Sequence, residues 1–140
     1  MNNIFFKNKG PFKIDQLLKL SDIPNRNNFT KFKVTDIKDI ANAENSEITF
    51  FHSKKYEHLA SKTKAFFCIT TDNLSKMLPT KCNKIIVDNV LISTAMITKT
   101  FYPNSATDDF DSSVKEITKT SFKKNVKFGK NVLVGKNVKI

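Results

Sequence analysis

The side chains best suited to chemistry in this 140-residue sequence are two histidines and two cysteines. No arrangement of serine, aspartate or glutamate around His52 and His58 suggests a nucleophile and its base, so we interpret both histidines as surface residues. Cys68 and Cys82 show no Cys-x-x-Cys motif and no histidine at zinc spacing. The sequence therefore predicts neither a disulfide framework nor a metal site, and Cys68 fits a buried strand.

Hydrophobic periodicity predicts a small domain in which strands and helices alternate, an α/β (α+β) arrangement. We expect helices over residues 12–20, 55–62, 73–78 and 90–101, and strands over residues 29–34, 48–51, 65–70 and 84–87. Asp88 or Asn89 could cap the last helix. The side chains expected to face inward are Ile14, Leu17 and Leu18 in the first helix, Tyr56, Leu59 and Ala60 in the second, and Leu91, Ala95, Ile97 and Phe101 in the last.

A repeat with a period of six residues begins after a polar linker, 104–111. One column of the repeat contains Val126, Val132 and Val138, and glycine or asparagine recurs in other columns. A period of six suits short strands joined by tight turns in a solenoid, and it fits neither a helix nor a plain hairpin. We therefore expect residues 112–140 to begin a left-handed parallel β-helix of hexapeptide repeats, preceded by a domain over residues 1–103. A β-hairpin with repeated Lys-Asn turns is the alternative.

The repeats stop after fewer than two coils, and Ile140 ends the sequence on a core column without a polar cap. Solenoids need about three or more units and a cap for stability. We therefore expect these 140 residues to be part of a longer protein.

The formal charge of +11 narrows the set of partners. Of the 24 basic residues only Arg26 is an arginine, whereas nucleic-acid readers depend on arginine forks. The lysines are spread along the chain without a block of like charges. We interpret the charge first as a solvated lysine-rich surface. A binding surface for an acidic protein or an anionic membrane is the second interpretation, and nucleic-acid binding is the least favoured.

Apolar runs in the sequence are far shorter than the roughly 20 residues of a membrane span. The N-terminus has no apolar core of a secretory signal, so we expect a cytoplasmic protein.

The residues Ile48-Thr49-Phe50-Phe51-His52-Ser53-Lys54-Lys55-Tyr56, followed by Leu59 and Thr63-Lys64-Ala65, carry a resemblance to a known family. This segment, placed before hexapeptide repeats, resembles the N-terminal domain of the UDP-3-O-acylglucosamine N-acyltransferases of lipid A biosynthesis. That family shows a pattern close to Ile-Ser/Thr-Phe-x-x-Asn-x-x-Tyr. The resemblance extends from about Phe12 to Ile140.

The resemblance implies a site for the uracil of a UDP-sugar. Its two flanking rings fall on Phe50 and Tyr56, and its asparagine falls on Ser53. A hydroxyl is shorter than an amide and offers a single donor, so either a neighbour such as His52 compensates or the nucleotide binds more weakly. The carried-over substrate-binding residues are therefore Phe50, Ser53 and Tyr56.

The reaction implied by the resemblance is transfer of a 3-hydroxyacyl group from an acyl carrier protein thioester to the 2-amine of UDP-3-O-acylglucosamine, with no other cofactor. The family takes its catalytic base from a histidine in the solenoid, and no histidine follows His58 here, so we expect no catalytic residue in this chain and no activity from it alone. The family also implies a homotrimer whose acyl and carrier-protein sites lie between subunits. Peripheral contact with the inner membrane surface is a further candidate.

Two other functions stay open at this point. One is another hexapeptide-repeat transferase acting on a sugar nucleotide, although a glycine-rich phosphate loop is absent from the sequence. The other is a basic binding module without enzymatic activity, whose binding would weaken steeply with salt if it contacted phosphate backbones.

Overall fold

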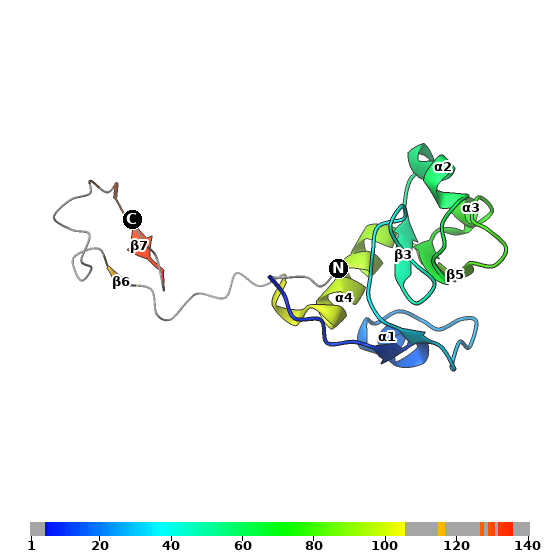
Figure 1. Cartoon of the computed structure of the whole chain (residues 1–140), viewed down its shortest axis with the longest axis horizontal. Coiled ribbons are helices and arrows are strands. Elements are labelled where there is room, and N and C mark those ends of the chain that lie inside the picture. Colours follow the sequence, from blue (N-terminus) through cyan, green and yellow to red (C-terminus); the bar gives the residue numbers. More distant parts are fainter. Residues whose placement is uncertain (1–4, 106–114, 117–126, 128, 131, 136–140) are drawn as a thin grey trace. The chain divides into compact units, whose positions relative to one another are not determined.

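The computed structural model describes residues 5–105, 115–116, 127, 129–130 and 132–135. The chain divides into two compact units, Met1–Thr107 and Asp108–Ile140. Helices cover both faces of a small sheet in the first unit (Figure 1). Its elements are β1 (Phe12–Lys13), α1 (Ile14–Leu20), β2 (Lys33–Val34), β3 (Ile48–Phe51), the 3-10 turn η1 (Lys54–Tyr56), α2 (Glu57–Ala60), β4 (Phe67–Thr70), α3 (Asp72–Ser75), β5 (Asn83–Ile86), α4 (Val90–Phe101) and the 3-10 turn η2 (Pro103–Ser105).

The sheet consists of β3, β4 and β5 in that order, all parallel, with Ile48 paired to Phe67 and Phe67 to Asn83. The chain that leads into β3 lies along its outer edge. The N–H of Ile48 donates to the carbonyl of Asp36 (3.0 Å), and the N–H of Lys38 donates to the carbonyl of Ile48 (3.0 Å). The carboxyl ends of the three strands therefore share one edge, where open α/β sheets commonly bind ligands.

Alternating side chains separate two cores on the two faces of the sheet. Ile48 and Ile69 belong to the core beneath α1 and α4, whereas Phe51 and Cys68 belong to the core beneath α2 and α3. Figure 1 shows these two pairs of helices on different sides of the strands. Phe50 packs against the first core, so the end of β3 sends one phenylalanine ring to each face.

The boundaries of α4 confirm the predicted helix over 90–101, and the side chain of Asn89 caps it by accepting the N–H of Ile92 (3.1 Å). The predicted inward face is partly wrong, because Leu91 and Ala95 are exposed. At 100° per residue these two positions lie away from the row that faces the sheet. That buried row consists of Val90, Ile97 and Phe101.

Two other predicted elements differ more strongly. The strand expected over 29–34 is reduced to β2, and the helix expected over 55–62 is divided into η1 and α2. Tyr56 was expected to face inward together with Ala60, but Tyr56 is 37% exposed and Ala60 is fully buried. A 3-10 turn has three residues per turn, so the tyrosine leaves the helical face on which Ala60 lies.

The second unit contributes β6 (Lys115–Glu116) and β7 (Leu133–Val134), which pair antiparallel. Most of the residues predicted to form hexapeptide coils lie outside the described part of the chain. The left-handed β-helix therefore stays a prediction, as does the division at residues 104–111.

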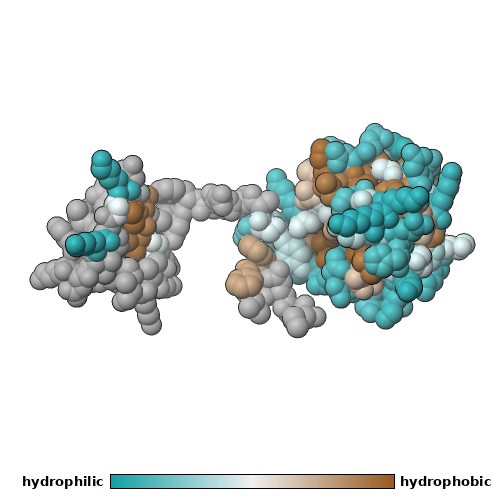
Figure 2. All heavy atoms as spheres, turned by 90° about the horizontal axis from the view of Figure 1, so that it is seen from above, coloured by the Kyte–Doolittle hydropathy of each residue, from teal (hydrophilic) through white to brown (hydrophobic). Residues whose placement is uncertain are grey.

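Hydrophilic residues cover much of the face of the first unit that Figure 2 shows, with smaller hydrophobic patches between them. Within the residues that the structure describes, no helix is long and apolar enough to cross a membrane.

Candidate functional site

A pocket of about 270 Å³ lies at the carboxyl end of β3. The chain reverses here from strand into the 3-10 turn η1, which brings strand and turn side chains to one wall. The segment along the outer edge of β3 adds Asp39 and Ile40 to the lining. The lining residues are Asp39, Ile40, Phe50, Phe51, His52, Tyr56 and Leu59.

Three of these residues form a row of rings, Phe50, His52 and Tyr56, which we call the ring row. The ring centroids of Phe50 and His52 are 6.3 Å apart with planes inclined at 30°, and those of His52 and Tyr56 are 5.6 Å apart at 45°. Phe50 is half-buried and anchored on the core, whereas His52 and Tyr56 are exposed. Such a row can hold a flat heterocycle, since aromatic rings attract one another in offset-stacked or edge-to-face arrangements at these separations.

Most of the side chains that line the pocket are apolar, and few polar side chains are among them. Ile40 and Phe51 are buried in the second core, and Leu59 packs against that core. The polar side chains that line the pocket come from Asp39, His52 and Tyr56. An apolar pocket with a few polar groups is the usual form of a small-molecule site.

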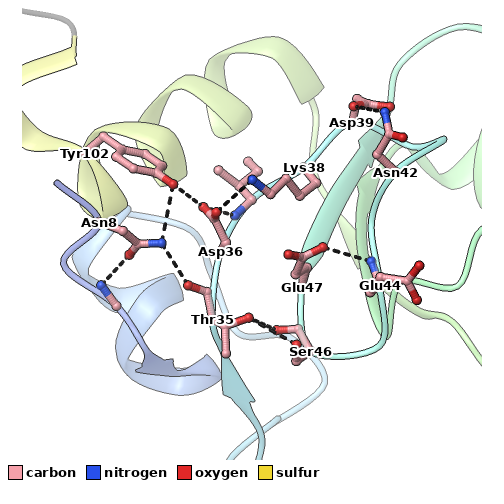
Figure 3. Close-up of polar contacts among 12 residues, drawn as sticks. Asn8, Thr35, Asp36, Lys38, Asp39, Asn42, Glu44, Ser46, Glu47 and Tyr102 are labelled. Atoms are coloured by element: carbon pink, nitrogen blue, oxygen red, sulfur yellow. Dashed lines mark hydrogen bonds and ion pairs between the residues drawn. The ribbon is translucent and has the colours of Figure 1, made fainter. Parts of the chain in front are cut away.

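The carboxylate of Asp39 is held by its own turn. The Nδ2 of Asn42 donates to Oδ2 (2.8 Å), and the N–H of Ala41 donates to Oδ1 (3.0 Å); Figure 3 shows the contact with Asn42. The hydrogen bond from Asn42 lowers the pKa of Asp39, and backbone N–H groups add to this effect against a smaller opposing influence of burial. Asp39 is thus ionised at neutral pH, and each oxygen can accept a further hydrogen bond.

A polar network fixes the chain just before Asp39. The hydroxyl of Tyr102 donates to Oδ1 of Asp36 (2.7 Å), while Nζ of Lys38 lies 3.0 Å from Oδ2 (Figure 3). Burial, followed by the hydrogen bond to Asp36, raises the pKa of Tyr102 to about 12. This network ties the edge segment to the end of α4. A second pocket of about 360 Å³, which includes Lys38 and Tyr102, adjoins the first and shares Phe50 and Asp39 with it.

Ser53, the third residue carried over from the family pattern, is not among the residues that line the pocket. It caps η1, where its hydroxyl accepts the N–H of Lys55 (3.4 Å) and its carbonyl accepts the N–H of Tyr56 (3.1 Å). Its side chain therefore serves its own turn. The structure brings Phe50 and Tyr56 together on one pocket and leaves Ser53 outside it.

Sequence reasoning missed the contribution of Asp39, Ile40 and Leu59 to this pocket. Asp39 and Phe50 are eleven positions apart in the sequence, and no motif joins them. The connection is the parallel bridge between Ile37 and Ile48, which a short polar segment does not reveal in advance. His52 is exposed as predicted, but it also lines the pocket.

The two cysteines are free and buried, and they pack in the second core. A hydrogen bond with Cys82, together with burial, raises the pKa of the Cys68 thiol, so Cys68 stays protonated at neutral pH. Among the described residues, no group of three or more His, Cys, Asp or Glu side chains is placed to hold a metal ion.

Comparison with known proteins gives a match to one family model, described as UDP-3-O-(3-hydroxymyristoyl) glucosamine N-acyltransferase, LpxD. The match covers residues 31–100, which is half of the chain and includes the ring row and Asp39.

Two curated relatives carry the name UDP-3-O-acylglucosamine N-acyltransferase 2, both from Legionella pneumophila. The protein of strain Paris is 26% identical over 121 residues, which is 86% of this chain and 35% of the relative. The protein of strain Philadelphia 1 is 26% identical over 110 residues, which is 78% of this chain and 32% of the relative. The chain thus spans about a third of the length of these relatives. By the family match over half of its length, the chain belongs to the UDP-3-O-acylglucosamine N-acyltransferase family.

Proposed function

We propose that this chain is the nucleotide-binding front part of an N-acyltransferase that acts on UDP-3-O-acylglucosamine, and that the pocket beside the ring row holds the uracil. The observation that carries this proposal is the placement of Phe50 and Tyr56 on one pocket within the segment that matches the family. Stacking on an aromatic side chain contributes about 1–3 kcal/mol per base. Two rings therefore suffice for a weak, millimolar uracil site in the absence of further contacts to phosphate and sugar.

The complete reaction would transfer a 3-hydroxyacyl group from an acyl carrier protein thioester to the 2-amine of the sugar, in the cytoplasm and without another cofactor. The amine needs a base, and the thioester oxygen needs hydrogen-bond donors as negative charge develops on it. No histidine follows His58 in these 140 residues, so the base that the family takes from its solenoid is not supplied by them.

Three partners belong to the same proposal. Carrier proteins of this type are acidic, which suits the formal charge of +11. The homotrimer would form through the hexapeptide solenoid, which places the acyl and carrier-protein sites between subunits. The acylated substrate would favour peripheral contact with the inner membrane surface.

The direct test is a titration of the 140-residue chain with UMP, followed by amide chemical shifts. We expect saturable shifts at Phe50, His52 and Tyr56, and none of comparable size with ribose 5-phosphate, which lacks the base. The same titration at low and high salt separates the proposal from a phosphate-backbone binder, because stacking of uracil depends weakly on salt. Equal shifts with both ligands, or no shifts with UMP, would contradict the proposed uracil site.

A further inference from the structure

The wall of the ring-row pocket carries two polar groups whose chemistry matches one edge of a pyrimidine. Asp39 presents an ionised carboxylate that only accepts hydrogen bonds, and His52 presents an imidazole with one donor and one acceptor when neutral. The edge of uracil offers an N3–H donor between two carbonyl acceptors. A carboxylate and an imidazole N–H together complement that edge.

The position that the family pattern assigns to this task is unsuited to it here. Ser53 uses its hydroxyl within its own turn and does not line the pocket, while its neighbour His52 contacts both other rings of the ring row. If uracil is preferred over other flat rings, groups other than the Ser53 hydroxyl must recognise its edge, and Asp39 and His52 are polar side chains that line the pocket.

We propose that Asp39 and His52 read the pyrimidine edge, with the carboxylate of Asp39 accepting N3–H and the imidazole of His52 donating to an adjacent carbonyl. This inference rests on the proposed function and adds the residues that set its base specificity. Cytosine carries an unprotonated N3, whose lone pair faces the carboxylate unfavourably, so the pocket distinguishes uridine from cytidine nucleotides.

The turn that holds Asp39 supports this role. Hydrogen bonds from Asn42 and Ala41 orient both carboxylate oxygens, and each oxygen keeps capacity for another donor. The network of Tyr102 with Asp36 holds the preceding segment in place (Figure 3). The acceptor is thus positioned before a ligand arrives, which reduces the entropy lost on binding.

The test uses changes in the ligand, so that the wild-type chain is sufficient. UMP, its N3-methylated form 3-methyl-UMP, and CMP are titrated into the 140-residue chain. We expect 3-methyl-UMP and CMP to bind at least about fivefold more weakly than UMP, as the loss of one hydrogen bond predicts. Equal affinity for UMP and 3-methyl-UMP overturns the inference while leaving the uracil site itself in place. No binding of UMP at all overturns the proposed function as well.

Variants then show which side chain causes the difference in affinity between UMP and 3-methyl-UMP. In Asp39→Ala the difference between UMP and 3-methyl-UMP should disappear, since the acceptor is gone and the methyl group has room. In Ser53→Ala the difference should persist. If the difference persists in Asp39→Ala and disappears in Ser53→Ala, the assignment to Asp39 is overturned.

His52→Phe keeps a ring in the ring row and removes the donor. It should weaken UMP binding about three- to tenfold, whereas His58→Phe, a matched change at an exposed histidine outside the pocket, should leave the affinity unchanged. Equal effects of the two changes overturn the role of His52.

Discussion

Two of the aromatic groups in the first unit differ in how their rings meet. Phe29, Phe32, Phe66 and Phe67 form a packed cluster in which Phe66 and Phe67 lie edge-on, with centroids 5.2 Å apart at 85°. In the ring row the planes of Phe50 and His52 are inclined by only 30°, and the pocket lies alongside. Edge-to-face packing places ring edges against ring faces and stabilises the fold, whereas the exposed rings of His52 and Tyr56 stay accessible to a ligand in the pocket.

Exposure alone does not separate the two groups. Phe32 in the packed cluster is 46% exposed, which is more than the 37% of Tyr56 in the ring row. Phe32 nevertheless contacts Phe66 at 4.6 Å and Phe67 at 5.8 Å between centroids. The difference lies in the neighbours: polar groups on a pocket mark a binding site more reliably than an exposed ring does.

The largest effect should come from the packed cluster. Phe67 is 1% exposed and lies between β3 and β5 in the first core, so Phe67→Ala should lower the free energy of unfolding by about 3–5 kcal/mol. Urea unfolding followed by circular dichroism measures this loss. Because Phe67→Ala can unfold the chain entirely, Phe67→Leu, with an expected loss of about 1–2 kcal/mol, serves as a milder variant. The UMP affinity of the folded fraction should stay within a factor of two.

Substitutions in the ring row should weaken UMP binding and leave the free energy of unfolding almost unchanged, the reverse of Phe67→Ala. Tyr56→Ala removes one stacking face and should weaken UMP binding by about 1–3 kcal/mol, measured by titration of amide shifts. The free energy of unfolding should change by less than about 0.5 kcal/mol, because the side chain is exposed. Phe32→Ala is the matched control, with UMP affinity retained. If Tyr56→Ala binds UMP as the wild type does, the two aromatic groups do not differ in the way proposed.

Stability at high pH tests the network behind the pocket wall. The pKa of Tyr102 is raised in the folded chain, so the stability it contributes is complete below its ordinary pKa near 10 and is lost as the pH rises toward about 12. The melting temperature of the wild type should therefore fall more between pH 10 and 12 than that of Tyr102→Phe, which has no ionisable group there. If the melting temperatures of the two proteins fall equally, the pKa of Tyr102 is the same in the folded and unfolded chain.

At neutral pH, Tyr102→Phe should lower the free energy of unfolding by about 1–2 kcal/mol through the lost hydrogen bond to Asp36. Its effect on UMP binding should be small, because Asp36 keeps its contacts with Lys38 and the backbone.

The framework of the first unit could be predicted from the sequence where apolar patterns are long. The helix over 90–101 and the strand over 48–51 have the predicted boundaries, since each is marked by a cap or by consecutive apolar residues. The strand over 29–34 was overestimated. Polar residues separate its phenylalanines. Residues 29–32 lie outside any ladder, and the side chain of Asn25 bonds to both the N–H and the carbonyl of Phe29.

The site was less accessible to prediction because it depends on two separated segments. Phe50 and Tyr56 could be named from a local pattern, and both line the pocket. Asp39 could not, because its place beside β3 follows from a single parallel bridge at Ile37. Ser53 was assigned by position in a motif, and the hydrogen bonds of the 3-10 turn determine what its hydroxyl does.

The smallest effect should therefore come from Ser53. Ser53→Ala removes a weak 3.4 Å cap on a three-residue turn, so the free energy of unfolding should fall by no more than about 0.5 kcal/mol. UMP affinity should stay within a factor of two. Ser53→Asn restores the residue type of the family pattern and should also change UMP affinity by less than twofold, because Asp39 and His52 already supply the polar contacts to the base. If Ser53→Asn binds UMP clearly more tightly, and N3 methylation of the ligand removes this gain, then position 53 recognises the base. That outcome would contradict the role proposed for Asp39.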